Sequence, residues 1–171
     1  VSQRGAQTLK WEEGVPGAPL LDFALHHLTL GRTALYKSIL TKSEVRGAKS
    51  EVDQAVSGLR RAGQVQELPR GLLTRAWFRA MSGDHIGAQS DLDEAWEIAE
   101  RGSMKLFMAD IHLYRARLFG RVKDEGGSMK YPWESPAADL AAARKLIEQC
   151  GYWRRKEELE DAEAALGIGP K

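Results

Sequence analysis

The side chains that most often do chemistry are represented here by four histidines and one cysteine. The histidines are His26, His27, His85 and His112. Neither an HExxH motif nor a comparable spacing joins them, so the sequence predicts no metal site. Cys150 stands at the predicted C-terminal end of a helix, where the helix dipole disfavours the thiolate that a nucleophile needs. We therefore predict no catalytic residue and no cofactor.

A Gly-Gly-Ser stretch at residues 126–128 is the remaining feature that could hold a phosphate. A phosphate-binding loop needs the GxxxxGK[ST] spacing after a strand, and neither the spacing nor a strand pattern is present. The chain also lacks a Ser-centred nucleophile elbow. We interpret the stretch as part of an insertion loop and predict that the protein is not an enzyme.

Composition narrows the class of protein further. Lys and Arg total 25 and Asp and Glu total 24, so the net charge of +1 argues against a nucleic-acid-binding domain. With 43% hydrophobic residues the chain can bury a core, and no apolar run is long enough for a transmembrane helix. A single cysteine cannot form an internal disulfide, so we expect a cytoplasmic location. Because the chain begins at Val1 without a secretory segment, we expect a fragment of a longer protein.

Three segments of the sequence align with one another without gaps. They are residues 48–63, 88–103 and 136–151. Apolar residues coincide at three positions of this alignment: Val52, Leu92 and Leu140; Ala55, Ala95 and Ala143; Leu59, Ala99 and Ile147. The positions are three and then four residues apart, which is the spacing of one apolar stripe on a helix.

A second kind of segment lies between these. Residues 71–84 and 111–124 align at Leu73 with Leu113, Arg75 with Arg115, Ala76 with Ala116, and Asp84 with Asp124. The repeat distance is 40 residues, except for the last helix of the third unit, which is offset by 48. The extra residues fall within 125–135, whose Gly, Pro and Trp residues are typical of a loop.

The boundaries of these segments carry helix-end residues. Pro69 suits the first turn of a helix, Gly83 suits a turn, and Ser135 before Pro136 suits an N-cap. No alternating run of β-branched residues predicts a strand. We predict an all-α fold, an α-solenoid of stacked antiparallel helix pairs. The single domain would span 1–171, with the tail of a truncated repeat at 1–19, repeats at 20–63, 68–103 and 106–151 (loop 125–135 included), and a capping helix at 152–166.

The turn and helix residues together resemble the tetratricopeptide repeat. The match rests on Gly83, Asp84, Ala88, Leu92 and Ala95, on Leu72 and Ala76, on Leu30 and Gly31, and on Ala116, Asp124, Leu140 and Ala143. The repeats are longer than the usual ~34 residues, with Lys123 in place of Gly and Pro136 in place of Ala. The resemblance covers residues 20–166 and implies an array like those at the C-terminal ends of large bacterial multidomain proteins, including signalling NTPases.

In a tetratricopeptide array the first helix of each pair lines a concave groove. The resemblance implies that the partner-binding residues on this face are Arg32, Tyr36, Arg70, Trp77, Arg117 and Arg121. Arg interleaved with aromatic residues is the composition of binding hot spots, and Arg pairs with carboxylates in bidentate fashion. The alternative is that these Arg side chains are solvated or pair with local carboxylates, and the sequence leaves both open.

Trp133, in the inserted loop, allows two interpretations as well. It either packs into a gap of the helix stack or stands exposed as an anchor for a partner.

These features predict a non-enzymatic scaffold module that binds a protein or an acidic peptide on its concave face. The alternative is a sensor or autoinhibitory region of a bacterial multidomain signalling NTPase or regulator, which would bind other domains of its own chain. We expect neither a nucleic acid nor a membrane as partner, and an exposed end of the stack could support a homodimer.

The repeat register makes a prediction about Ala95. Its small side chain is expected to face a neighbouring helix at close range, so the substitution Ala95→Leu should overpack the core. The expected loss is about 1–3 kcal/mol of stability, measured by thermal melting. A variant that melts like the wild type would contradict the register.

Overall fold

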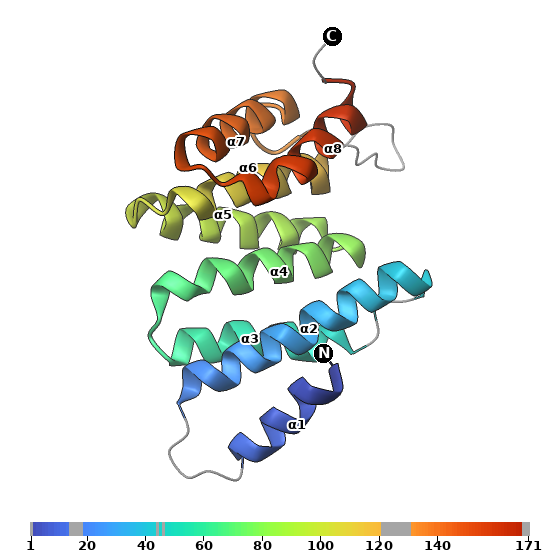
Figure 1. The fold of residues 1–171 in the computed structure, drawn as a ribbon, viewed down its shortest axis with the longest axis vertical. Coiled ribbons are helices and arrows are strands. Elements are labelled where there is room, and N and C mark those ends of the chain that lie inside the picture. The colour runs from blue at the N-terminus through green and yellow to red at the C-terminus, as the bar shows by residue number, and fades with distance from the viewer. Residues whose placement is uncertain (1, 14–18, 44, 46, 121–130, 169–171) are drawn as a thin grey trace. The chain divides into compact units, whose positions relative to one another are not determined.

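A computed structural model describes residues 2–13, 19–43, 45, 47–120 and 131–168. These residues form eight α-helices and no strand (Figure 1), so the predicted all-α class is confirmed. The chain divides into two compact units, residues 1–95 and 96–171, and the boundary falls inside one helix. None of the described helices is both long and apolar enough to span a bilayer.

The first unit is built from helices that contact their neighbours in the sequence. They are α1 (Ser2–Glu13), α2 (Leu20–Thr41), α3 (Ala48–Arg61), a short 3-10 helix (Val65–Glu67), α4 (Leu68–Met81) and the first part of α5 (His85–Arg101). α2 and α3 form an antiparallel pair, and α4 packs on both of them (Figure 1). Because α3 returns the chain between them, α2 and α4 run in the same direction.

Two glycines allow α2 and α3 to approach closely. A Cβ added at Gly31 would lie 2.7 Å from Cγ1 of Val52, and one added at Gly58 would lie 2.8 Å from Cβ of Ala24. Both distances are too short for real carbon atoms, so a larger residue would push the helices apart. Gly31 is one of the residues on which the tetratricopeptide resemblance rests, together with Leu30.

The apolar stripe predicted from the aligned segments is confirmed. Its nine positions, from Val52 to Ile147, are each at most 1% exposed. A stripe with this spacing puts one face of each helix into the core, and the residues between the stripe positions remain available for polar contacts.

The second unit contains the end of α5 and three further α-helices. They are α6 (Lys105–Phe119), α7 (Pro136–Cys150) and α8 (Lys156–Leu166), with a short 3-10 helix (Trp153–Arg155) before the last. α7 packs on α6, and α8 packs on both. Their core consists of Ala109, Leu113, Ala116, Leu140, Ala143, Ile147, Leu159 and Ala162.

The helix ends follow the predicted capping chemistry. Oγ of Ser135 accepts a hydrogen bond from the backbone N–H of Ala138 at 3.0 Å, with Pro136 in the first turn. Gly83 has a φ of 82° between α4 and α5, a left-handed conformation that glycine adopts without strain. One boundary differs: α8 begins at Lys156 rather than at Tyr152, because a 3-10 helix (Trp153–Arg155) precedes it. The Tyr152 hydroxyl donates to Oδ2 of Asp110 at 3.2 Å.

A carboxylate recurs at the same position of the second helix in each predicted pair. The position is four residues into the aligned segments, one before the first stripe residue, and holds Glu51, Asp91 and Asp139. Each carboxylate contacts the preceding helix: Nδ1 of His27 lies 2.8 Å from Glu51, Nη2 of Arg75 lies 2.7 Å from Asp91, and Nδ1 of His112 lies 2.5 Å from Asp139. The two helices of each pair are therefore joined by a polar contact beside their apolar stripe.

The Asp91 carboxylate is the most buried of the three. Its side chain is 2% exposed and accepts hydrogen bonds from Arg75, and Nη1 of Arg79 lies 2.8 Å away. Burial by itself would lower the pKa of the Arg75 guanidinium, but the hydrogen bonds and charge of Asp91 outweigh it and raise that pKa above its ordinary value. Two cations thus compensate one carboxylate that water does not reach.

Removing the Asp91 carboxylate should therefore be costly. We expect Asp91→Ala to lower the free energy of unfolding by about 3 kcal/mol, because the largely buried Arg75 guanidinium keeps only the more distant and more exposed Asp53, 3.8 Å away, as an ion-pair partner. Glu94→Ala is the matched control on the same helix, since the Glu94–Arg60 ion pair is solvent-exposed and should contribute less than about 1 kcal/mol. Urea unfolding followed by circular dichroism measures both. Equal midpoints for the two variants would refute this role of Asp91.

Candidate functional site

Four of the predicted binding residues meet in the first unit, where α2 lies against α4. Arg32 and Tyr36 come from α2, and Arg70 and Trp77 come from α4. The Tyr36 and Trp77 rings pack edge to face, with 5.1 Å between centroids and 71° between planes. This is the favourable geometry for an aromatic pair. The structure therefore brings these four residues together from two helices separated by α3.

Arg32 connects the two helices. Its Nε donates to Oγ1 of Thr74 at 2.9 Å, and its Nη2 donates to the backbone carbonyl of Arg70 at 3.3 Å. Thr74 is 1% exposed, and its hydroxyl in turn donates to the carbonyl of Arg70 at 2.9 Å. Arg32 thus hydrogen-bonds to a buried hydroxyl and an exposed carbonyl of α4, one turn before Tyr36 on α2.

An exposed apolar strip continues from the aromatic pair. We call Tyr36, Leu40, Trp77 and Met81 the α2–α4 strip. Leu40 and Met81 each follow one helical turn after an aromatic residue, so they lie on the same sides of their helices. Tyr36 is 58% exposed, Leu40 83% and Met81 40%, whereas Trp77 is half-buried. Leu40 was not among the residues predicted from the sequence, although its spacing of four from Tyr36 was a usable signal.

The charge around the α2–α4 strip is positive. α2 and α4 together carry five basic residues and one acidic residue: Arg32, Lys37, Arg70, Arg75 and Arg79 against Asp22. Arg75 and Arg79 are directed at Asp91, which leaves Lys37, next to Tyr36 in the sequence, and Arg70 as the exposed cations of these two helices. Arg70 is 44% exposed and lies 3.3 Å from Oε2 of Glu67.

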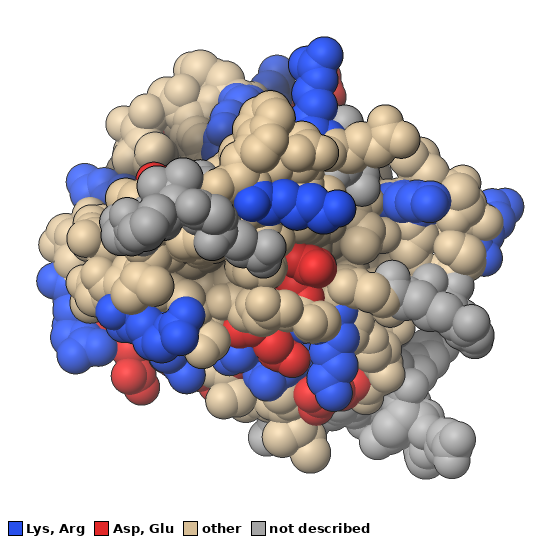
Figure 2. All heavy atoms as spheres, turned by 90° about the horizontal axis from the view of Figure 1, so that it is seen from below, with Lys and Arg blue, Asp and Glu red and all other residues tan. Residues whose placement is uncertain are grey.

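This positive charge is local. On the face that Figure 2 shows, Lys and Arg side chains lie among acidic and uncharged ones rather than forming one continuous basic area. The mixture agrees with the net charge of +1.

Arg117 belongs to the second unit and is engaged there. Its Nη1 lies 3.0 Å from Oε2 of Glu158 on α8, and Glu158 also pairs with Arg155 at 2.6 Å. Pairing with a local carboxylate was the alternative interpretation of the predicted Arg residues, and it describes Arg117. Its part in binding stays a prediction. Arg121 lies outside the described residues.

Trp133 packs against its own unit. Its ring lies 5.1 Å from Phe119 and 5.3 Å from Tyr131, both edge to face, and the Arg115 guanidinium lies 4.6 Å from its centre. These contacts support the packing interpretation of Trp133 over the interpretation as an exposed anchor.

A Tyr–Asp–His cluster lies nearby and was not predicted. Both oxygens of Asp139 are used, one by Nδ1 of His112 and the other by the Tyr131 hydroxyl. Burial and the hydrogen bond to Asp139 raise the pKa of Tyr131 well above its ordinary value, so the hydroxyl stays a donor. The alignment of Asp139 with Asp91 was the available signal. Because His112, Asp139 and Tyr131 bond to one another, we interpret the cluster as a structural hydrogen-bond network. It connects α6, α7 and the segment that precedes α7.

Within the described ranges, no three His, Cys, Asp or Glu side chains lie close enough together to hold a metal ion. No protein-family model, curated protein or solved structure matches the chain. The resemblance to the tetratricopeptide repeat therefore stays a prediction.

The hydrogen bonds of Arg32 make a stability prediction. Arg32→Ala should lower the free energy of unfolding by about 2 kcal/mol, because it removes charge-assisted hydrogen bonds to partly buried groups. Lys37→Ala, which removes an exposed cation from the same helix, should change stability by less than about 0.5 kcal/mol. Chemical denaturation compares the two. If both variants unfold at the same denaturant concentration, Arg32 does not tie α2 to α4.

Proposed function

We propose that the protein is a non-enzymatic module that binds an acidic peptide segment of a partner protein at the α2–α4 strip. The proposal rests on the exposure of Tyr36 and Leu40, which are 58% and 83% exposed on a helix whose other side is in the core. Tyr36 packs against Trp77, and Leu40 follows Tyr36 by one helical turn. Single exposed apolar residues are ordinary, whereas a contiguous row on two adjoining helices is typical of an interaction surface.

The residue types of the α2–α4 strip and their restricted side chains favour tight binding. Trp, Tyr and Arg are the residue types that contribute most at protein interfaces, and here they stand on helices rather than on a loop. The edge-to-face contact with Trp77 and the hydrogen bonds of Arg32 restrict these side chains before a ligand arrives. A preorganised surface loses less conformational entropy when it binds.

The surface carries apolar side chains and cations, and these two kinds of group indicate the chemistry of the ligand. Large apolar side chains of the peptide would cover Tyr36, Leu40 and Met81, and its carboxylates would pair with Lys37 and Arg70. A helix laid along the strip and an extended segment both provide such a pattern. The proposal predicts peptides in which Asp or Glu alternates with aromatic or branched apolar residues.

Selection from a random peptide library tests this directly. The selected peptides should be enriched in acidic and large apolar residues, and titration calorimetry should show at least about tenfold weaker binding to the double variant Tyr36→Ser, Leu40→Ser. Both positions are exposed, so the variant should keep the melting temperature of the wild type.

Ile86→Ser is the matched control, since Ile86 is an 85% exposed apolar residue of α5 outside the α2–α4 strip. It should bind the selected peptides like the wild type. Equal affinity of the double variant and the control would move the interface away from the strip, and basic rather than acidic peptides would refute the proposed charge complementarity.

A further inference from the structure

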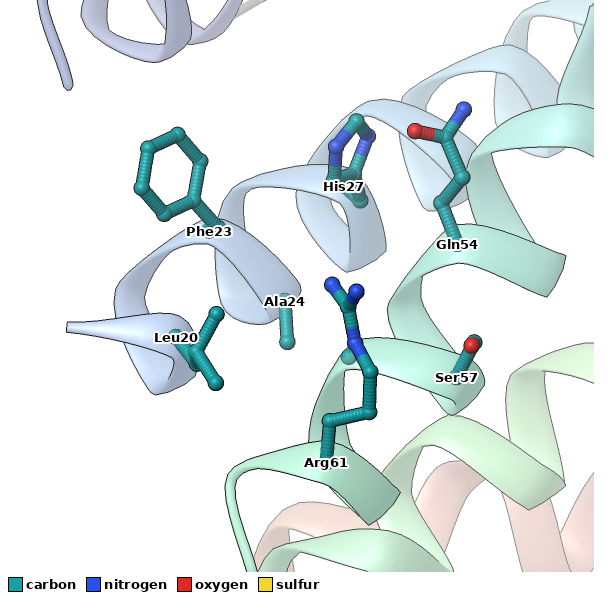
Figure 3. Close-up of a pocket in the computed structure, with 8 residues that line it drawn as sticks. Leu20, Phe23, Ala24, His27, Gln54, Ser57 and Arg61 are labelled. Atoms are coloured by element: carbon teal, nitrogen blue, oxygen red, sulfur yellow. The ribbon is translucent and has the colours of Figure 1, made fainter. Parts of the chain in front are cut away.

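A pocket of about 460 Å³ opens between α2 and α3 in the first unit (Figure 3). This volume lies within the range of small-molecule sites, roughly 300–1,000 Å³. The pocket adjoins the close contact between Ala24 and Gly58. It lies on the side of α2 that faces α3 and shares no residue with the α2–α4 strip.

The lining separates into an apolar end and a polar end. Leu20 and Phe23 lie at one end of the view in Figure 3, and Gln54 and Ser57 lie at the other, with the Arg61 guanidinium reaching between the helices. Such a division suits a ligand with one apolar part and one polar part, because each end stabilises a different group.

Arg61, which is exposed, supplies a positive charge to the lining. Among the described residues, no carboxylate lies within ion-pair distance of its guanidinium, whereas the neighbouring Arg60 pairs with Glu94 at 2.6 Å. Of the other polar side chains of the lining, Gln54 and Ser57 are neutral, and Nδ1 of His27 lies 2.8 Å from Oε2 of Glu51. A negatively charged group on a ligand would therefore pair with Arg61.

We propose that this pocket binds a small organic monocarboxylate that carries an aromatic or branched apolar group. The planar guanidinium of Arg61 matches a carboxylate with two parallel hydrogen bonds. The Ser57 hydroxyl and the Gln54 amide provide further donors for the same group, although Nε2 of Gln54 already gives one hydrogen to Ser50 at 2.9 Å. The apolar group would rest on Leu20 and Phe23. A phosphate dianion would bring a second negative charge close to the Glu51 carboxylate, which lies 2.8 Å from His27.

Phenylacetate is a suitable probe. Phenylacetamide, which lacks the charge, and acetate, which lacks the ring, are the comparison compounds. Titration calorimetry of the purified chain should show phenylacetate binding at least about tenfold more tightly than either compound. Arg61→Gln should weaken phenylacetate binding by about tenfold or more. Arg60→Gln removes the same charge from the adjacent position, outside the pocket, and should leave the affinity within about twofold.

Nuclear magnetic resonance locates the binding. Phenylacetate should shift the amide signals of Phe23, Ser57 and Arg61, and the melting temperatures of the two Arg variants should agree. Equal binding of acetate and phenylacetate, equal loss in both Arg variants, or shifts confined to other residues would each overturn the proposal. A peptide that ends in phenylalanine and binds about ten times more tightly than phenylacetate would overturn the assignment to a small free acid.

Discussion

The first unit depends on the ion pairs made by the buried carboxylate of Asp91. A charge that is 2% exposed is tolerated only with its counter-ions in place, so Arg75 and Arg79 of α4 must lie where α5 can meet them. The same position holds Glu51 and Asp139, which contact His27 and His112. Each contact fixes the position of the second helix of a pair along the axis of the first. Apolar packing alone defines this position less precisely.

Small residues then decide how close the helices come. Gly31 fits against Val52 and Gly58 against Ala24, so α2 and α3 touch along their backbones. α4 packs on both, and this brings α2 and α4 together although a whole helix separates them in the chain. The α2–α4 strip and the pocket are consequences of this arrangement, since each lies where α2 meets a different neighbour.

The arginines illustrate how one residue type serves several purposes. Arg75 neutralises a buried carboxylate, Arg32 hydrogen-bonds across two helices, Arg117 pairs with Glu158, and Arg61 reaches into a pocket. Guanidinium is suited to all four because it stays charged and offers several donors in a plane. An arginine-rich helix face in the sequence is therefore not by itself a binding surface. What distinguishes the α2–α4 strip is the exposure of the apolar residues beside its cations.

The sequence by itself determined the all-α class, the capping residues and the apolar stripe through Val52, Leu92 and Leu140, because all of these arise from local spacing and local hydrogen bonds. Its resemblance to the tetratricopeptide repeat also predicted that Tyr36 and Trp77 share one binding surface. Only the tertiary structure decided that these two rings touch, that Arg32 is a tie between helices, and that Arg61 faces a pocket. Those outcomes depend on which side chains from distant segments meet, and periodicity along one helix says which residues share a face but not what that face contacts.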